Sequence, residues 1–237
     1  MPEQQDIPWK RLAVEAIAIV GSILLAFAID AWWEVRQDSA EEQTLLRQLE
    51  AEFELNAELL AVQRSRHEEN LAAAHSLLTI TGPNLEKRTL DLKSIKQDVH
   101  RMMFWWTYDP QMGVLNGIIQ SGKLGIIGSD RLRSKLANWP AQLRDLAEDE
   151  LFLVSHSKNV IMPLLSDSTS IRNISFNPAV GGSEFLNDIE DMLVSRKFEN
   201  AVHLKLNLTE ELLGYYDDTK AYIDNTLALI KEEIKFE

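Results

Sequence analysis

The stretch Leu12–Trp33, LAVEAIAIVGSILLAFAIDAWW, decides how this chain is organised. It has 22 residues with two formal charges, Glu15 near its start and Asp30 near its end. As a helix it would be about 33 Å long, which matches the hydrocarbon core of a bilayer, about 30 Å thick. We therefore predict a single-pass transmembrane helix at 12–33, which follows a short tail, residues 1–11, and contacts the lipid bilayer.

The residues on either side of this stretch support a membrane span and indicate its orientation. Tryptophans concentrate at membrane–water interfaces. They lie at both ends of the stretch, as Trp9, Trp32 and Trp33. Lys10 and Arg11 precede the stretch, whereas Arg36 and Arg47 follow it among several acids. By the positive-inside rule the N-terminus is expected in the cytoplasm and the bulk of the chain outside, which for a bacterial inner membrane is the periplasm.

A cleaved signal peptide is the alternative interpretation of the same stretch. Lys10 and Arg11 would form its basic start, and Ala26-Phe27-Ala28 has the small-residue form of a cleavage site. Against cleavage, Glu15 interrupts the apolar region, and apolar residues continue beyond Ala28. We therefore expect the helix to stay attached as an anchor.

One face of the predicted span carries small residues and ends in an acid. Small residues let transmembrane helices approach closely, and intramembrane carboxyl groups usually face a bundle interior or water. The face comprises Glu15, Ala18, Ser22, Ala26 and Asp30. It predicts that the span self-associates. The two acids either lie at the headgroup boundary or line an ion or proton path in a homo-oligomer.

The composition limits the classes of function. The chain has 237 residues, of which 45% are hydrophobic and 26% charged, so most of it can build a packed core. Its net charge of −13 repels nucleic acid, which we therefore exclude as a partner. The chain has no cysteine, which excludes disulfides, iron–sulfur clusters and thiol catalysis.

A long helix is expected to follow the span directly, because residues 34–81 contain neither glycine nor proline. Seven residues recur there at the 3-4 spacing of a coiled coil, and four of them are apolar and three polar. These positions are Leu46, Leu49, Phe53, Asn56, Leu60, Gln63 and His67. The three polar members have two interpretations. They set the register or copy number of a coiled coil, or they are exposed beside the buried stripe of a wider bundle.

The rest of the chain is also expected to be helical. Apolar periodicity predicts a second helix from about 90 to 109, a third over 111–124, further helix over 129–163, a loop at 166–183, and a last long helix over 198–236. An earlier start of that last helix, near Glu184, is the other possibility. The predicted class is all-α, with the transmembrane helix continuing into a long helix and an antiparallel helical bundle, and with 34–237 as one soluble domain.

The sequence contains no complete motif for a bound cofactor or metal. Gly117–Lys123 fits the pattern G-x-x-x-x-G-K, but Leu124 stands where a phosphate-binding loop needs a serine or threonine, and no apolar strand precedes it. We expect Gly122 to end a helix instead. The histidines are not spaced for a zinc or di-iron site, so no cofactor, metal or catalytic residue is predicted. They are His67, His75, His100, His156 and His203.

The densest apolar patch outside the span is Met102–Tyr108. Core packing is one interpretation, because aromatic side chains dominate buried surface. A partner-binding patch is the other, because tryptophan and tyrosine are enriched at interfaces. One helix face cannot bury so many consecutive large residues. The candidate partner residues are Met103, Phe104, Trp105, Trp106 and Tyr108.

Three short motifs resemble a broad bacterial family of single-span membrane proteins that is described only as a domain of unknown function. They are Ile29–Glu34 followed by Leu46–Leu49, Glu52 and Asn56; Leu115 followed by Ser121–Ile127, Leu132, Arg133 and Leu136; and Tyr215-Tyr216. The resemblance implies a membrane location and a helical architecture. It implies no reaction, cofactor or catalytic residue.

Together these observations favour a non-enzymatic, membrane-anchored helical protein that self-associates or serves as a scaffold or accessory subunit of a membrane complex. One alternative is a homo-oligomeric ion or proton conduit lined by Glu15 and Asp30. Another is a periplasmic sensor module that signals through a partner protein.

Overall fold

The structure, a computed structural model, describes residues 9–85, 90–175, 178–185 and 189–234. Within these ranges the regular elements are all helices and no strand occurs, so the predicted all-α class is confirmed. Most of the predicted tail 1–11 and the end of the last predicted helix lie outside the described residues. The elements are α1 (Trp9–Ile80), α2 (Leu92–Met103), α3 (Gly113–Gln120), η2 (Lys123–Ile126), α4 (Asp130–His156), η3 (Ser157–Ile161), α5 (Met162–Ser168), α6 (Ile171–Ile174), α7 (Ile189–Leu193) and α8 (Arg196–Glu233).

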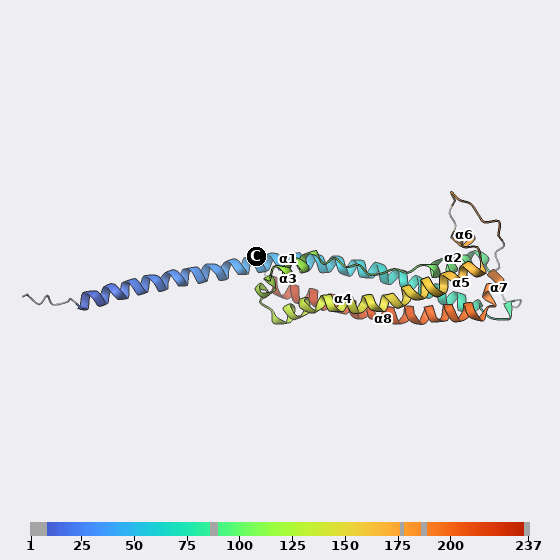
Figure 1. Cartoon of the computed structure of the whole chain (residues 1–237). Helices are drawn as coiled ribbons and strands as arrows, with labels where there is room; N and C mark the ends of the chain where they lie inside the picture. Colours follow the sequence, from blue (N-terminus) through green and yellow to red (C-terminus); the bar gives the residue numbers. More distant parts are fainter. Residues whose placement is uncertain (1–8, 86–89, 176–177, 186–188, 235–237) are drawn as a thin grey trace, which may run out of the picture.

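Helix α1 gives the molecule its extended shape. It is one uninterrupted helix of 72 residues, and Figure 1 shows its N-terminal part projecting away from the remaining helices. Helix α1 is tied to other elements where it enters the body. There the Glu41 carboxylate lies 2.6 Å from Lys123 Nζ, and Glu42 accepts a hydrogen bond from the Gly128 N–H at 2.6 Å. We call residues 41–234 the body and residues 9–40 the projecting part of α1.

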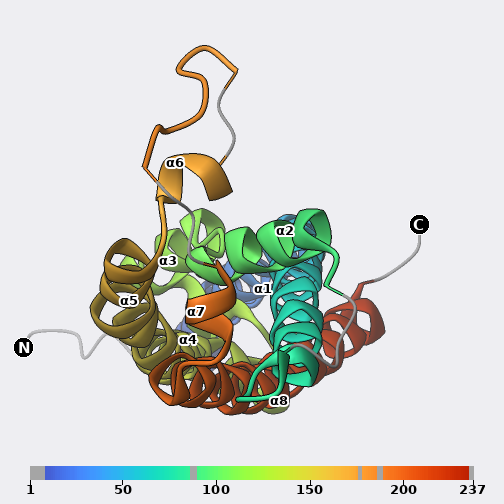
Figure 2. The same cartoon turned by 90° about the vertical axis from the view of Figure 1, so that its right-hand side faces the viewer.

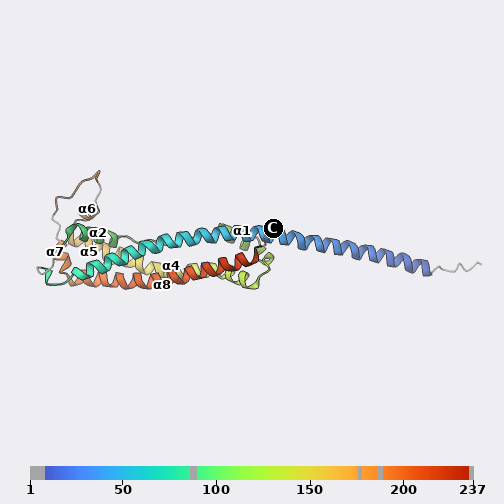
Figure 3. The same cartoon turned by 180° about the vertical axis from the view of Figure 1, so that it is seen from behind.

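In the body, α8 lies side by side with both α1 and α4, and the three helices run along its length (Figures 2 and 3). Helices α1 and α8 run in opposite directions. Near one end Gln43 Nε2 donates to the Glu233 carbonyl at 3.1 Å, and toward the other His75 Nε2 lies 3.7 Å from the Glu210 carboxylate. Figure 1 shows α3 and η2 at the end of the body where α1 projects, and α6 and α7 at the opposite end.

Two apolar clusters form the core of the body. The cluster nearer the projecting part joins α1, α3, α4 and α8, and includes Leu46, Phe53, Leu115, Trp139, Tyr216 and Ile223. The Trp139 ring lies between Phe53 and Tyr222, with ring centroids 5.5 and 5.4 Å away. The distal cluster joins the far ends of α1 and α8 to the short helices, and includes Leu77, Val99, Ile161, Leu193 and Val202.

The second predicted helix was wrong at its end, because α2 stops at Met103 and not near residue 109. Phe104 has extended backbone angles, with φ −96° and ψ 158°, and residues 104–112 form no helix. We call residues 104–112 the strap. A helix presents each side chain at 100° from the last, so consecutive large apolar residues cannot all face the core. Pro110 also disfavours a helical conformation at Asp109.

Other boundaries differ from the predictions by smaller amounts. Gly122 adopts the left-handed conformation, with φ +73°, directly after the last turn of α3, as predicted for a glycine that ends a helix. Helix α5 continues to Ser168 and α6 occupies Ile171–Ile174, so part of the predicted loop 166–183 is helical; residues 176–177 of it lie outside the described ranges. The last long helix begins at Arg196, two residues before the predicted position, and α7 precedes it as a separate turn.

Candidate functional site

The projecting part of α1 is an apolar surface that no other described element covers. An 18-residue window there has a mean hydropathy of 1.7 and no buried residue. The predicted packing face lies entirely on it, and all of its members are exposed: Glu15, Ala18, Ser22, Ala26 and Asp30. The tryptophans predicted at the two membrane interfaces, Trp9, Trp32 and Trp33, belong to the same part of α1. Trp32 and Trp33 are exposed, and the Arg36 guanidinium lies 5.7 Å from the Trp32 ring centroid; the Trp9 side chain lies outside what the structure describes.

The candidate partner patch does not form one surface. Met103 and Tyr108 are buried in the body, Trp105 and Trp106 are half-buried, and Phe104 is 41% exposed. The chain achieves this division by leaving the helical conformation after Met103, so that the strap runs along the body between α2 and α3 (Figure 1).

Polar side chains of α1 satisfy the backbone of the strap. Asn56 bonds Gln111 twice, donating to its carbonyl at 2.8 Å and accepting from its N–H at 2.7 Å. His67 Nε2 lies 3.1 Å from the Trp106 carbonyl oxygen, and Asn70 donates to the Phe104 carbonyl at 3.2 Å. Extended backbone buried against a core needs such partners, because an unpaired peptide group there is costly.

These contacts explain two of the three polar residues, Asn56, Gln63 and His67, that occupy coiled-coil positions in α1. Asn56 and His67 are wholly buried within the single chain, so neither of the two predicted interpretations describes them. Gln63, the third, is half-buried and accepts a hydrogen bond from Arg66 at 3.2 Å. Burial lowers the pKa of His67 to about 4. Its imidazole is therefore neutral, as a donor to the Trp106 carbonyl.

Helices α4 and α8 contribute Glu150 and Tyr216 to the same assembly. Glu150 Oε1 accepts hydrogen bonds from the Tyr108 backbone N–H, at 2.8 Å, and from the Tyr216 hydroxyl. The Tyr108 hydroxyl in turn donates to the Asn56 carbonyl at 3.1 Å. Burial raises the pKa of Glu150, and the two hydrogen bonds oppose that rise. Glu150 of α4 therefore connects the strap both to its own helix and to α8.

Lys205 holds the start of the strap from α8. Its ammonium donates to the carbonyls of Met102 and Phe104, at 2.6 and 3.0 Å, and to the Ser157 hydroxyl at 3.0 Å. Three acceptors match the three N–H donors of a lysine. No carboxylate within 4.0 Å pairs with it among the described residues, and burial lowers the pKa of Lys205 to about 7. Ser157 and Lys205 are both wholly buried, so their pairing stabilises the fold and reaches no substrate in this conformation.

Glu52 positions the helix that follows the strap. Its carboxylate accepts hydrogen bonds from the N–H groups of Val114 and Leu115, at 2.6 and 3.0 Å, in the first turn of α3. Met112, the residue before α3, makes no side-chain capping bond, so the cap comes from α1 instead. A carboxylate at a helix N-terminus is also favoured by the helix dipole.

Sequence reasoning assigned no structural role to Glu52, Glu150 or Lys205, because charged residues on helices are usually solvated; Glu52 entered only as a member of a motif. A signal for two of them exists in the spacing. Glu52 lies three residues after Leu49 and four before Asn56, in the buried stripe of α1. Lys205 lies at the same spacing within the buried stripe of α8, between Val202 and Thr209. A charged residue at a core position of a helix is the pattern to look for.

Because Glu150 accepts hydrogen bonds from the strap and from α8, two substitutions at this position should change the free energy of unfolding by different amounts. Glu150→Gln keeps an acceptor for Tyr108 and Tyr216 without a buried charge, and should change the free energy of unfolding at pH 7 by less than about 1 kcal/mol. Glu150→Ala leaves both donors unpaired beside a cavity, and should lower it by about 2–4 kcal/mol. Guanidinium unfolding of the full chain in mild detergent, followed by circular dichroism, measures both.

The same pair of variants has a pH signature. A raised pKa means that the native state keeps the carboxyl proton longer than the unfolded state, so wild-type stability falls as pH rises above the ordinary value of 4.5. Glu150→Gln should lack this decrease. Equal destabilisation by glutamine and alanine at pH 7 would show that the two hydrogen bonds do not depend on an acceptor at this position.

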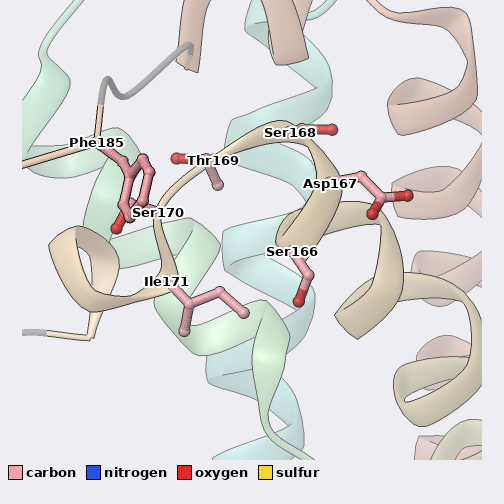
Figure 4. Close-up of a pocket in the computed structure, with 7 residues that line it drawn as sticks. All are labelled: Ser166, Asp167, Ser168, Thr169, Ser170, Ile171 and Phe185. Carbon is pink, nitrogen blue, oxygen red and sulfur yellow. The ribbon is translucent and has the colours of Figure 1, made fainter. Parts of the chain in front are cut away.

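A hollow of about 440 Å³ lies at the distal end of the body, between the end of α5 and the start of α6. Its lining is Ser166, Asp167, Ser168, Thr169, Ser170, Ile171 and Phe185. Figure 4 shows Asp167 and Ser168 pointing to one side, and Thr169 and Phe185 to the other. Small-molecule sites instead have polar groups that converge on a ligand. The hollow therefore carries no chemistry that we can assign.

The histidines do not assemble into a metal site within the described part of the chain, where no group of three potential ligands meets. Two of them serve as backbone partners: His156 Nε2 lies 2.9 Å from the Ala201 carbonyl oxygen, and His67 Nε2 lies 3.1 Å from that of Trp106. Lys123, the lysine of the phosphate-loop-like pattern, pairs with Glu41.

No protein-family model, curated protein or solved structure matches this chain. The resemblance to a bacterial single-span family therefore stays a prediction.

Proposed function

We propose that this chain is a membrane-anchored helical protein that acts through self-association, or as a scaffold or accessory subunit of a membrane complex. One observation carries the proposal. Eleven large apolar side chains between Ile17 and Val35 are each 49–72% exposed, on all sides of one helix. Water-soluble proteins rarely expose a continuous apolar surface of this extent, and lipid is the solvent in which it is stable.

In this proposal residues 12–33 cross the membrane and continue without a break into an antiparallel helical bundle formed by residues 34–237. The body begins at Glu41, eight residues beyond Trp33, which corresponds to about 12 Å along the helix. It would therefore lie close to the headgroups, with α3, η2 and the end of α8 nearest to them. Lys10 and Arg11 favour a cytoplasmic N-terminus in a bacterial inner membrane and a periplasmic body.

Self-association follows from the small residues of the span. Side chains of residues 17–38 are exposed on every face of α1, so the body leaves Ala18, Ser22 and Ala26 open to a neighbouring helix. Small residues are enriched where helices pair in lipid, because apolar burial provides no driving force there and close approach of the backbones does. The Ser22 hydroxyl donates to the Ile19 carbonyl at 2.8 Å, so this polar side chain does not oppose insertion.

Enlarging the small residues should separate the copies. We expect the double substitution Ser22→Ile and Ala26→Ile to weaken self-association in mild detergent about tenfold or more, because the helices can no longer approach closely. Native mass spectrometry across a dilution series measures the copy number. Ala28→Ile makes the same alanine-to-isoleucine change as Ala26→Ile on the other side of the helix and should leave the copy number unchanged.

The scaffold form of the proposal has its own outcome in that experiment. A stable mass that contains another membrane protein would identify the chain as an accessory subunit. A wild-type chain that is monomeric at all concentrations and carries no other protein would contradict the proposal.

A further inference from the structure

A second uncovered apolar feature lies on the body, between α4 and α8, which run side by side in Figure 1. Phe152 of α4 is 65% exposed, although it stands next to the fully packed Leu153. Across from it, α8 presents Leu208 and Tyr215, and Leu204 stands on the same face of α8 one turn before Leu208. A groove of about 290 Å³ lies between the two helices, lined by Asp149, Phe152, Leu208, Glu211, Leu212 and Tyr215. We call it the α4–α8 groove.

The apolar residues of the groove have the spacing of a helix-binding surface. Leu208 and Tyr215 of the groove lie seven residues apart on α8, with buried Leu212 between them, and exposed Leu204 extends the same helix face by one turn beyond the groove lining. Leu204 to Tyr215 covers about 16 Å, or three helical turns. Grooves of this form bind amphipathic helices through apolar residues at positions i, i+3 or i+4, and i+7.

The rim of the groove is acidic on both sides. Asp149 of α4 and Glu211 of α8 line the groove, and Asp145 and Glu148 of α4 lie close enough to Asp149 for their charges to act on it. No cation within 4.0 Å pairs with any of these four among the described residues. Burial, and then the charges of Glu211, Glu148 and Asp145, raise the pKa of Asp149. These carboxylates repel one another, and a cation bound between them would relieve the repulsion.

We propose that the α4–α8 groove binds a basic amphipathic helix of another protein. Apolar side chains of that helix would cover Phe152 and Leu208, and its lysine or arginine residues would neutralise the acidic rim. A second copy of this chain fits poorly, because a symmetric contact would bring the same four acids together. The inference gives the proposed scaffold a class of partner, but it concerns the body and does not require the span to cross a membrane.

A designed peptide tests the groove directly. The probe is an 18-residue amphipathic helix of leucine and lysine with a fluorescein label, titrated with the full chain in non-ionic detergent, with empty micelles as background. We expect saturable binding at a one-to-one ratio, which weakens as salt increases. The same peptide with glutamate in place of lysine should not bind.

Matched variants locate the binding. The double substitution Phe152→Ala and Leu208→Ala should weaken binding at least tenfold, and Asp149→Asn with Glu211→Gln should weaken it and flatten its salt dependence. Phe185→Ala removes an aromatic side chain that is 83% exposed elsewhere on the body and should change nothing. A thermal unfolding curve for each variant identifies any that fails to fold.

Two results would overturn the proposal: equal binding by the wild type and the folded Phe152→Ala, Leu208→Ala variant, or equal binding of the lysine and glutamate peptides. Absence of saturable binding to the wild type would do so as well. Because the titration uses micelles, none of these results depends on whether residues 12–33 span a bilayer.

Discussion

Replacing Leu24 and Leu25 by arginine is expected to move the chain from the membrane fraction to the soluble or degraded fraction. Both residues lie at the centre of the proposed span, and each is 62% exposed. An arginine at the centre of a transmembrane helix costs about 2.5–3.5 kcal/mol on insertion scales, so the pair costs about 5–7 kcal/mol. Extraction with alkaline carbonate, followed by immunoblotting of pellet and supernatant, measures the change.

The control for this experiment is on the same helix. Leu55 and Val62 of α1 are 44% and 49% exposed on the body, outside the proposed span. Arginine at both positions adds the same charge without placing it in lipid, so this variant should stay with the membranes as the wild type does. If the Leu24→Arg, Leu25→Arg chain also resists carbonate extraction, or if the mature wild-type chain starts after Ala28, residues 12–33 are not the anchor.

Removing Lys205 is expected to produce the largest loss of stability in the body. Lys205→Ala leaves the Met102 and Phe104 carbonyls without this donor and opens a cavity, which should lower the free energy of unfolding by about 3–5 kcal/mol. Lys205→Met fills most of the space but makes no hydrogen bond, and should cost about 1–3 kcal/mol. Guanidinium unfolding of the full chain in mild detergent separates the two effects.

Lys205 also predicts how stability depends on pH. Its pKa is about 7 in the native state and 10.5 when unfolded, so above pH 7 the native state loses this proton while the unfolded state keeps it. The unfolded state then binds more protons, and wild-type stability rises with pH across this window. Relative to Lys205→Met, the wild type should gain about 2 kcal/mol between pH 7 and pH 9. Parallel pH profiles for the two chains would show that Lys205 titrates normally.

The helical class and some of the helix ends were predictable from local patterns. The absence of glycine and proline over 34–81 predicted a helix that the structure continues to Ile80, and Gly122 ends α3 as expected. The error at α2 had a local cause too. The periodicity of Leu90, Ile95, Val99 and Met102 extends by chance to Trp106, and periodicity cannot reveal that the backbone beyond Met103 finds its hydrogen-bond partners elsewhere.

The groove and the strap were out of reach of sequence reasoning for a related reason. Phe152 and Trp139 are both aromatic residues of α4, yet one is 65% exposed and the other wholly buried. Their difference depends on which side α8 occupies. In the same way, Asn56 and Glu150 bond the strap from different helices, and nothing in either helix alone identifies that shared partner.

The amino-acid sequence alone determined the helical class, the long first helix and the apolar stretch that we propose crosses a membrane. Helical hydrogen bonds join residues four apart, and the affinity of a helix for lipid depends on its own side chains. The course of residues 104–112, and the roles of Asn56, Glu150 and Lys205, depended on packing. A buried polar group is stable only where a distant backbone supplies its partner, and three separate helices must meet before that backbone is in place.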